Sequence, residues 1–175
     1  MLFLDGKHQL HNVKNGYTWQ LKGGSGTMVL HSNTGRKRIN ILGALNPLSF
    51  DLTSIVTESN CNKELLMLFV DEIKKSYSSC EKIYIILDNA PYNRSYDLQD
   101  YCEDLGIELI YLPSYSPNLS LIERFWKFFI KKTVTNIHYD TFEKFFGSIV
   151  NFLGNLKSHV EELKKLITMN FEIIN

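Results

Sequence analysis

Three acidic residues, far apart in the chain, are the side chains best suited to do chemistry together. Asp5 follows the apolar run 2–4. Asp88 follows the apolar run 83–87, and Glu123 stands near the start of an expected helix. Taken singly, each also has a structural explanation, because Asp-Gly is typical of a hairpin turn, an Asp after a strand can cap the next helix, and Ser-x-x-Glu is a capping box.

If the three carboxylates share one cleft, their chemistry is specific. Like charges held together repel and raise one another's pKa, an arrangement that makes sense mainly when cations neutralise them. A set of ligands made only of oxygen atoms favours Mg²⁺ or Mn²⁺ over zinc. Two such ions can stabilise the attacking and the leaving oxygen of an in-line phosphoryl transfer. Asp5, Asp88 and Glu123 are therefore predicted to be catalytic and to bind two metal ions.

The first part of the chain predicts an antiparallel meander. Asn33-Thr34-Gly35 is a turn signal, and the glycine-rich stretch 23–26 is expected to be a loop. That stretch lacks the Lys-Ser/Thr sequel of a phosphate-binding loop, so no nucleotide site is expected there. The segments expected to be extended are residues 1–10, 17–21, 27–32 and 38–45.

The middle of the chain predicts a strand, a helix and a second strand. Apolar residues recur at helical spacing over 63–77, and the apolar runs 83–87 and 107–112 predict strands buried on both faces. With a helix over 92–105 between them, these strands should be parallel and joined by a right-handed crossover. Asp88 then emerges at the carboxyl edge of the sheet, the usual place for ligand sites in open α/β sheets.

The remainder of the chain is expected to be helical. Ser116 as N-cap and Pro117 at the first helical position predict a helix over 117–132 that carries Glu123. A capping-box start at Asp140 predicts a long C-terminal helical region, which Gly154 divides in two.

Together these elements predict an α/β fold with a mixed five-stranded sheet flanked by helices. A first strand lying centrally, beside the strand over 83–87, would bring Asp5 and Asp88 side by side. Glu123 could then close the site from its helix. The placement of the three residues on one sheet is what favours the catalytic interpretation over three separate turns and caps.

Composition limits the classes of protein. A chain of 175 residues with 44% hydrophobic and 13% aromatic content predicts one compact domain. Three widely spaced cysteines suggest neither a disulfide framework nor a zinc site, so a reducing cytoplasm is expected. No apolar run approaches membrane-spanning length, and no membrane partner is expected. The formal net charge is zero, so DNA binding would depend on local basic clusters.

Two passages carry a family resemblance. Residues 86–90 (Ile-Leu-Asp-Asn-Ala), and residues 112–119 leading into 122–126 (Ile-Glu-Arg-Phe-Trp), resemble bacterial insertion-sequence transposases of the mariner superfamily, the insertion-sequence 630 group. Thirty-four residues separate Asp88 from Glu123, the spacing characteristic of that superfamily. The resemblance covers residues 1 to about 133. Weaker support comes from residues 4–8 with His11, from 16–19 with 22–23, and from 35–40.

The resemblance implies a ribonuclease-H-like catalytic domain with an Asp, Asp, Glu triad. Its implied reaction is metal-dependent cleavage at transposon ends, followed by attack of the freed 3′ hydroxyl on target DNA. Asp5 and Asp88 would bridge two Mg²⁺ or Mn²⁺ ions, and Glu123 would complete the coordination of one. The implied partner is double-stranded DNA, bound by a homodimer in the bacterial cytoplasm, at the nucleoid.

Basic and polar residues near these motifs are candidate DNA contacts. Three basic residues stand beside a turn, two lysines stand at i, i+4 on the helix of Glu123, and a histidine and an asparagine stand near the aspartates; each could equally be an ordinary solvated side chain. The residues predicted to contact nucleic acid are His8, Arg36, Lys37, Arg38, Asn89, Lys127 and Lys131.

The chain also departs from the family pattern. Ser120 and Leu121 replace the usual Asn-Pro, and Asn93 stands where His is usual. The N-terminal helix-turn-helix region is expected to be absent, so the chain resembles a catalytic domain alone, with a core over 1–133 and a C-terminal helical region over 134–175. An upstream reading frame could supply the missing region. Two alternatives stay open: an impaired remnant that binds DNA or an intact transposase without cutting, and a stand-alone ribonuclease-H-like nuclease.

Overall fold

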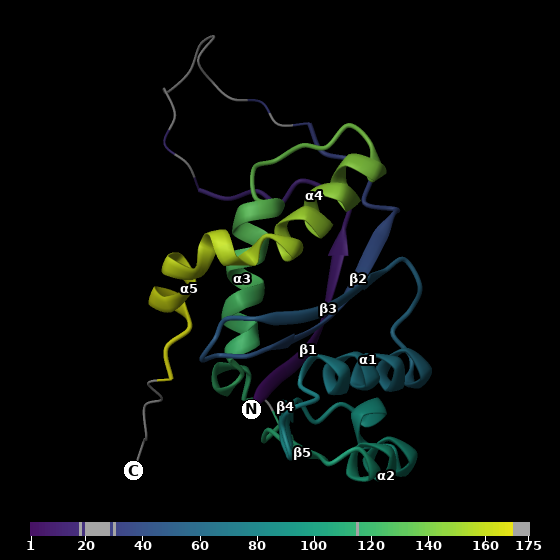
Figure 1. The fold of residues 1–175 in the computed structure, drawn as a ribbon. Coiled ribbons are helices and arrows are strands. Elements are labelled where there is room, and N and C mark those ends of the chain that lie inside the picture. Colours follow the sequence, from purple (N-terminus) through teal and green to yellow (C-terminus); the bar gives the residue numbers. More distant parts are fainter. Residues whose placement is uncertain (18, 20–28, 30, 115, 170–175) are drawn as a thin grey trace.

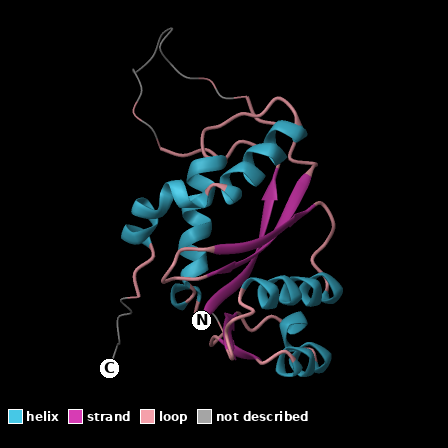
Figure 2. Cartoon of the chain, viewed as in Figure 1, coloured by secondary structure: helices cyan, strands magenta, loops and turns pink. Residues whose placement is uncertain are grey.

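A mixed β-sheet with helices on both faces forms the body of the molecule (Figures 1 and 2). The glycine-rich loop expected at 23–26, and most of the segments expected to be extended at 17–21 and 27–32, lie outside the described residues. The computed structural model describes residues 1–17, 19, 29, 31–114 and 116–169.

The sheet has β1 at its centre. The strand order is β3-β2-β1-β4-β5, with β1–β2 and β2–β3 antiparallel and β1–β4 and β4–β5 parallel. Both the mixed five-stranded sheet and the central place of the first strand were predicted, and both are confirmed. The strands are β1 (Leu2–Leu10), β2 (Arg38–Leu45), β3 (Leu52–Thr57), β4 (Ile83–Leu87) and β5 (Ile107–Tyr111).

The antiparallel part of the sheet contains one strand, β3, that was not predicted. The described residues of 27–32 are not in a strand, and β3 supplies the third antiparallel strand instead. The sequence of β3, Leu-Thr-Ser-Ile-Val-Thr, lacks the regular alternation of apolar and polar residues that marks a strand with one buried face, and all six residues are half-buried. The turn before it is fixed by Asn46, whose side-chain oxygen accepts the N–H groups of Leu48 and Ser49.

Helices cover both faces of the sheet (Figure 2). Helices α1 and α2 pack on one face, and α3 and α4 pack on the other, where α5 lies against α3. The helices are α1 (Lys63–Ser76), α2 (Tyr96–Asp104), α3 (Leu121–Thr133), α4 (Phe142–Gly154) and α5 (Val160–Leu166). The short 3₁₀ turns are η2 (Pro91–Arg94), η3 (Pro117–Leu119) and η4 (Leu156–His159).

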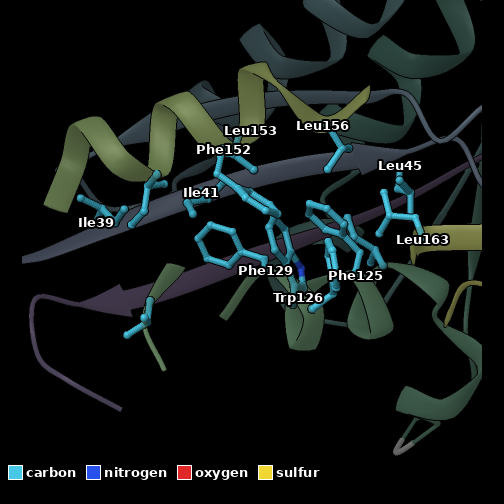
Figure 3. Packing of buried hydrophobic residues seen from close by; sticks show 14 of the residues in the cluster. Ile39, Ile41, Leu45, Phe125, Trp126, Phe129, Phe152, Leu153, Leu156 and Leu163 are labelled. Carbon is cyan, nitrogen blue, oxygen red and sulfur yellow. The ribbon is translucent and has the colours of Figure 1, made fainter. Parts of the chain in front are cut away.

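Helix α3 lies at the centre of the larger core (Figure 3). Its Phe125, Trp126 and Phe129 are at most 1% exposed and pack in the same cluster as Ile39 and Ile41 of β2. Burying this apolar stripe fixes the rotation of α3 about its own axis. The side chains at the start of α3 therefore have a set direction relative to β1.

Two helix starts differ from the prediction. The helix expected over 117–132 begins as η3, and α3 starts only after Ser120, which has extended backbone angles (φ −89°, ψ 109°). The helix expected over 92–105 likewise begins as η2, and α2 starts after the extended Ser95. In both places the proline begins a short 3₁₀ turn rather than the α-helix itself.

The C-terminal helical region is divided as predicted. Helix α4 ends at Gly154 and is followed by η4 and α5. Its N-cap is Thr141, whose hydroxyl accepts the N–H of Lys144 at 3.3 Å, rather than the predicted Asp140. None of the helices in the described part of the chain is long and apolar enough to span a lipid bilayer.

Candidate active site

The register of the two central strands places the two aspartates side by side. Leu2 of β1 pairs with Ile85 of the parallel strand β4. Asp5 stands three residues further along β1, and Asp88 stands at the corresponding position, one residue beyond the end of β4. The adjacency that was predicted from the order of the elements is therefore present in the sheet.

Asp5 lies within β1 and faces α3. Phe3 belongs to the core on the α3 side of the sheet, whereas Leu2 and Leu4 belong to the core on the α1 side. Because side chains alternate along a strand, Asp5 points to the same face as Phe3. The alternative of a hairpin turn at this Asp-Gly pair is wrong, since β1 continues to Leu10.

Trp126 of α3 fixes the orientation of the Asp5 carboxylate. The indole N–H of Trp126 donates a hydrogen bond to Asp5 Oδ2 at 3.0 Å. Gly43 of β2 pairs with Asp5 in the antiparallel ladder, and a Cβ at Gly43 would lie 2.9 Å from Cζ2 and Cη2 of the indole. Because Gly43 has no side chain, the indole can pack against β2 at the position from which it donates to the Asp5 carboxylate.

Asp88 is an exposed residue just beyond the end of β4, with one oxygen held by local donors. Its Oδ1 accepts the side-chain N–H of Asn93 at 2.7 Å and the backbone N–H of Ala90 at 3.2 Å. The bond from Ala90 is the local capping contact that was weighed as the alternative to a catalytic role. It occupies Oδ1, and the residue still lines the cavity described below.

Glu123 is the third residue of α3 and precedes Trp126 by three residues, which is slightly less than one helical turn. The N-cap is Ser120, as the capping-box alternative required, but the serine side chain makes no capping hydrogen bond. The capping box therefore lacks the hydrogen bond that the serine hydroxyl would accept from the Glu123 N–H. The carboxylate of Glu123 faces the same cavity as the two aspartates.

A cavity of about 370 Å³ brings these residues together. None of its lining residues carries a positive charge. One oxygen of the lining, Oδ1 of Asn89, is buried without a hydrogen-bond partner among the described residues. The cavity is lined by Leu4, Asp5, Asp88, Asn89, Ala90, Leu112, Pro113, Ser114, Ser116, Ser120 and Glu123.

The pKa of Asp5 depends on its burial and on the two other carboxylates. The pKa of Asp5 is raised to about 7, first by burial and then by the negative charges of Glu123 and Asp88. Hydrogen bonds from the Gly6 N–H and from Trp126 act in the opposite direction and favour the charged form. The negative charges of Glu123 and Asp88 therefore both act on the Asp5 carboxylate.

The three carboxylates share a cavity but are not drawn into a closed cluster. In the described ranges, no three His, Cys, Asp or Glu side chains are grouped closely enough to hold a metal ion jointly. The donor set still fits a hard divalent cation, because it consists of carboxylate oxygens, it has no basic neighbour in the cavity, and its buried member disfavours the uncompensated charge. That these residues bind metal remains a prediction.

The histidine predicted near the site is not brought to the cavity. His8 lies three residues beyond Asp5 on the same strand, which turns it to the opposite face of the sheet. It is exposed there, and its ring Nδ1 lies 3.1 Å from Asn40 Oδ1. His8 therefore does not line the cavity of the three carboxylates, and its contact with nucleic acid stays a prediction.

The basic turn also lies away from the carboxylates. Arg38 pairs with Leu10, at the far end of β1 from Asp5, roughly 16 Å along the strand. Arg38 donates to Asn60 Oδ1 at 2.7 Å, and Lys37 lies over the ring of Phe142, 4.8 Å from its centroid. Arg36 is exposed beside them.

The two predicted lysines of α3 line a groove against the C-terminal helix α5. The groove has a volume of about 670 Å³ and contains five basic side chains and one acidic side chain. Lys132 is paired with Glu162 at 2.8 Å, and Arg124 donates to the backbone carbonyl of Thr168. The groove is lined by Arg124, Lys127, Phe128, Lys131, Lys132, Glu162, Lys165 and Leu166.

Two residues that touch the triad were missed in the sequence. Trp126 was noted only as part of the motif at 122–126, yet it is 1% exposed, and its buried indole N–H needs an acceptor, which is Asp5. Asn93 was noted only as a departure from the family pattern, yet it is 2% exposed and donates to Asp88. The need of the buried indole for an acceptor could have identified the first; the second depends on tertiary placement.

Comparisons with known proteins agree with this geometry. The chain is 27% identical over 139 residues to the insertion element IS630 uncharacterized 39 kDa protein of Shigella sonnei, a match that covers 78% of this chain and 39% of that protein. It is similar to the Mos1 strand transfer complex with a TM-score of 0.67 at 14% identity, over 98% of this chain and 55% of that one. It is also similar to the Mos1 transposase catalytic domain with Raltegravir and Mn, with a TM-score of 0.57 at 11% identity, over 97% of this chain and 84% of that one.

The mixed sheet with helices on both faces defines a ribonuclease-H-like fold, as predicted. The model of the DDE superfamily endonucleases matches residues 1–145, and the chain belongs to that family. It spans about two fifths of the curated relative and about half of the Mos1 chain in the complex. The resemblance to insertion-sequence transposases is confirmed by these matches.

Proposed function

We propose that this chain is the catalytic domain of a DNA transposase, which cleaves DNA at transposon ends and transfers the freed 3′ hydroxyl into target DNA. The observation that carries the proposal is the shared cavity of Asp5, Asp88 and Glu123, which has no positive charge in its lining. Membership in the DDE superfamily endonucleases supports it. So does the similarity to the Mos1 strand transfer complex, a complex named for the second step.

Two divalent ions, Mg²⁺ or Mn²⁺, would supply the electrophilic stabilisation of the attacking and leaving oxygens. Paired-end complexes of Mos1 with Mn and with Mg support this choice of metal. Asp5, Asp88 and Glu123 would hold the ions, because their side chains line one cavity from β1, from the end of β4 and from α3. Trp126 would hold Asp5 in place while Asn89, in the lining of the same cavity, contacts the DNA.

Nicking of DNA by the purified chain tests the proposal. Supercoiled plasmid and a duplex oligonucleotide with a free 3′ hydroxyl would be incubated with Mg²⁺, Mn²⁺ or a chelator, and nicked and joined products would be separated on gels. We expect metal-dependent products from the parent and a loss of roughly 10²-fold or more in Asp88→Asn, because one bridging charge is removed. Asp97→Asn, at an exposed residue paired with Lys63 on α1, is the matched control.

The outcomes separate the candidate functions. Equal cleavage by Asp88→Asn would contradict the proposal. Binding of DNA without cleavage in either metal would favour an impaired remnant, and cutting of RNA–DNA hybrids without any joined product would favour a stand-alone nuclease.

DNA would pass along the groove between α3 and α5. Lys127 and Lys131 follow Glu123 at successive turns of α3, about 6 Å apart, so phosphates beyond the reacting one can meet them in order. The turn at Arg36, Lys37 and Arg38 would contact DNA further from the site. Within this proposal a homodimer synapses two ends in the bacterial cytoplasm, and a helix-turn-helix region, fused or encoded upstream, finds the terminal repeats.

The salt dependence of binding tests this path. Lys127→Ala with Lys131→Ala is expected to weaken binding to duplex DNA of any sequence, and to lower the slope of log K against log salt by about 2, since each lysine would release about one counterion. Fluorescence anisotropy over a salt series measures the slope. Lys75→Ala, which removes an exposed lysine of α1, should leave it unchanged. An unaltered slope in the double variant would place the DNA elsewhere.

A further inference from the structure

A buried asparagine stands behind the triad. Asn93 lies in η2, between the end of β4 and the start of α2, and is 2% exposed. It does not line the cavity of the three carboxylates. A polar side chain buried this completely needs partners for its hydrogen-bonding groups.

The amide nitrogen of Asn93 is directed at Asp88. Nδ2 donates to Asp88 Oδ1 at 2.7 Å and lies 3.4 Å from the backbone carbonyl of the same residue. The backbone of Asn93 is held from the other side, because the hydroxyl of Tyr111, at the end of β5, donates to its carbonyl at 2.7 Å. Asn93 is thus held by hydrogen bonds to residues at the ends of two neighbouring strands, β4 and β5.

The other half of the amide supports this orientation. Oδ1 of Asn93 is buried and has no hydrogen-bond partner among the described residues. Rotating the amide by half a turn would place this acceptor against the Asp88 carboxylate, where two acceptors repel. The side chain keeps one polar atom unsatisfied so that its N–H can face the aspartate. A group that only filled space would not need a polar atom there.

We propose that Asn93 is a positioning residue for metal binding, which fixes Oδ1 of Asp88 so that the other carboxylate oxygen is presented to the cavity. This inference rests on the proposed function, because it assigns the metal to the same three carboxylates. It gives Asp88 the arrangement already seen at Asp5, where the indole N–H of Trp126 holds Oδ2. Each aspartate of the central strands then has one oxygen fixed by a buried donor. Groups behind a metal ligand set its direction in this way.

Direct titration with Mn²⁺ tests the inference without reference to cleavage. Asn93→Leu keeps about the same volume and removes the donor, and we expect its Mn²⁺ affinity, measured by calorimetry, to fall about 10- to 100-fold. Asn93→His retains a ring N–H that can reach the carboxylate, and should bind within a few-fold of the parent. In nicking assays the first variant should lose kcat while its KM for DNA is unchanged.

Controls separate positioning from folding. Thr133→Val removes a different buried hydrogen bond, from the Thr133 hydroxyl to the Phe129 carbonyl at the far end of α3, and should keep the parental Mn²⁺ affinity. Circular dichroism verifies that each variant is folded, and if Asn93→Leu does not fold, the comparison of Asn93→His with the parent decides. Equal Mn²⁺ affinity of folded Asn93→Leu and the parent, or weak binding by folded Asn93→His, would overturn the inference. A parent that binds no Mn²⁺ would instead refute the proposed function.

Discussion

Asp5→Asn is expected to make the metal-free protein more stable and to abolish metal-dependent cleavage. The pKa of Asp5 is raised to about 7, first by burial and then by the charges of Glu123 and Asp88, so at neutral pH and above the folded chain holds a charge that it disfavours. Asparagine removes the charge and keeps an oxygen that can accept the Trp126 N–H. Cleavage should fall roughly 10³-fold, because one of the three proposed metal ligands is lost.

The size and sign of the stability change depend on pH. A carboxyl whose pKa is 3.8 when unfolded and about 7 when folded binds more protons in the folded state between these values. Its contribution is therefore fully favourable below pH 4 and is lost as the pH rises through 7. At pH 8 the gain from Asp5→Asn should be on the order of 2 kcal/mol, since solvent reaching the cavity reduces the full effect of the shift.

Urea denaturation of the parent and Asp5→Asn from pH 4.5 to 8.5 measures this difference. The gap in unfolding free energy should be near zero at pH 4.5 and should open between pH 5 and 7.5. Mn²⁺ should raise the melting temperature of the parent at pH 8 and leave Asp5→Asn nearly unchanged, because only the parent retains the full ligand set. A gap that is independent of pH, or a destabilised Asp5→Asn, would contradict the electrostatic account.

The order of the secondary structure elements was enough to predict where the triad lies. Asp5 and Asp88 each follow an apolar run, and a central first strand beside the second run leaves them adjacent whatever the loops do. The position of Glu123 followed from the start of its helix, even though that start was predicted four residues early. These features depend on local sequence pattern and on the order of the elements, and both can be predicted from the sequence.

The supporting contacts depend on tertiary packing, which local pattern does not carry. Asn93 meets Asp88 only because η2 folds back under the end of β4, and no periodicity marks that contact. Gly43 appeared as one more small residue in an extended run. Its role is set by an indole that arrives from α3, more than 80 residues later in the chain. His8 shows the limit of nearness in sequence, because strand alternation turns it to the other face of β1 although it stands only three residues from Asp5.

Gly43→Ala is expected to damage both stability and activity, although Gly43 does not line the cavity of the three carboxylates. Its Cβ would lie 2.9 Å from Cζ2 and Cη2 of Trp126, closer than such atoms approach in folded proteins. The indole is 1% exposed and packed between Phe125 and Phe129, so it cannot easily move aside. Overpacking of this kind costs about 1–3 kcal/mol.

The same substitution should also impair the active site, because shifting the indole lengthens its hydrogen bond to Asp5. Nicking is expected to fall about 10-fold or more in folded protein. Gly147→Ala, in α4 with open space around its Cβ, is the matched control and should be neutral or stabilising by up to about 1 kcal/mol. Chemical denaturation and the plasmid assay measure the two effects.

A double-mutant cycle attributes the damage to one contact. Trp126→Phe removes both indole carbons that a Cβ at Gly43 would strike, and it also removes the N–H that holds Asp5. If the clash is the cause, adding Gly43→Ala to Trp126→Phe should cost clearly less stability than Gly43→Ala costs in the parent. If the two costs simply add, Gly43 acts through the β1–β2 ladder instead. In that case packing within the α3 core alone would position the indole. The inference that Gly43 of β2 acts on the Asp5 carboxylate through Trp126 would then be refuted.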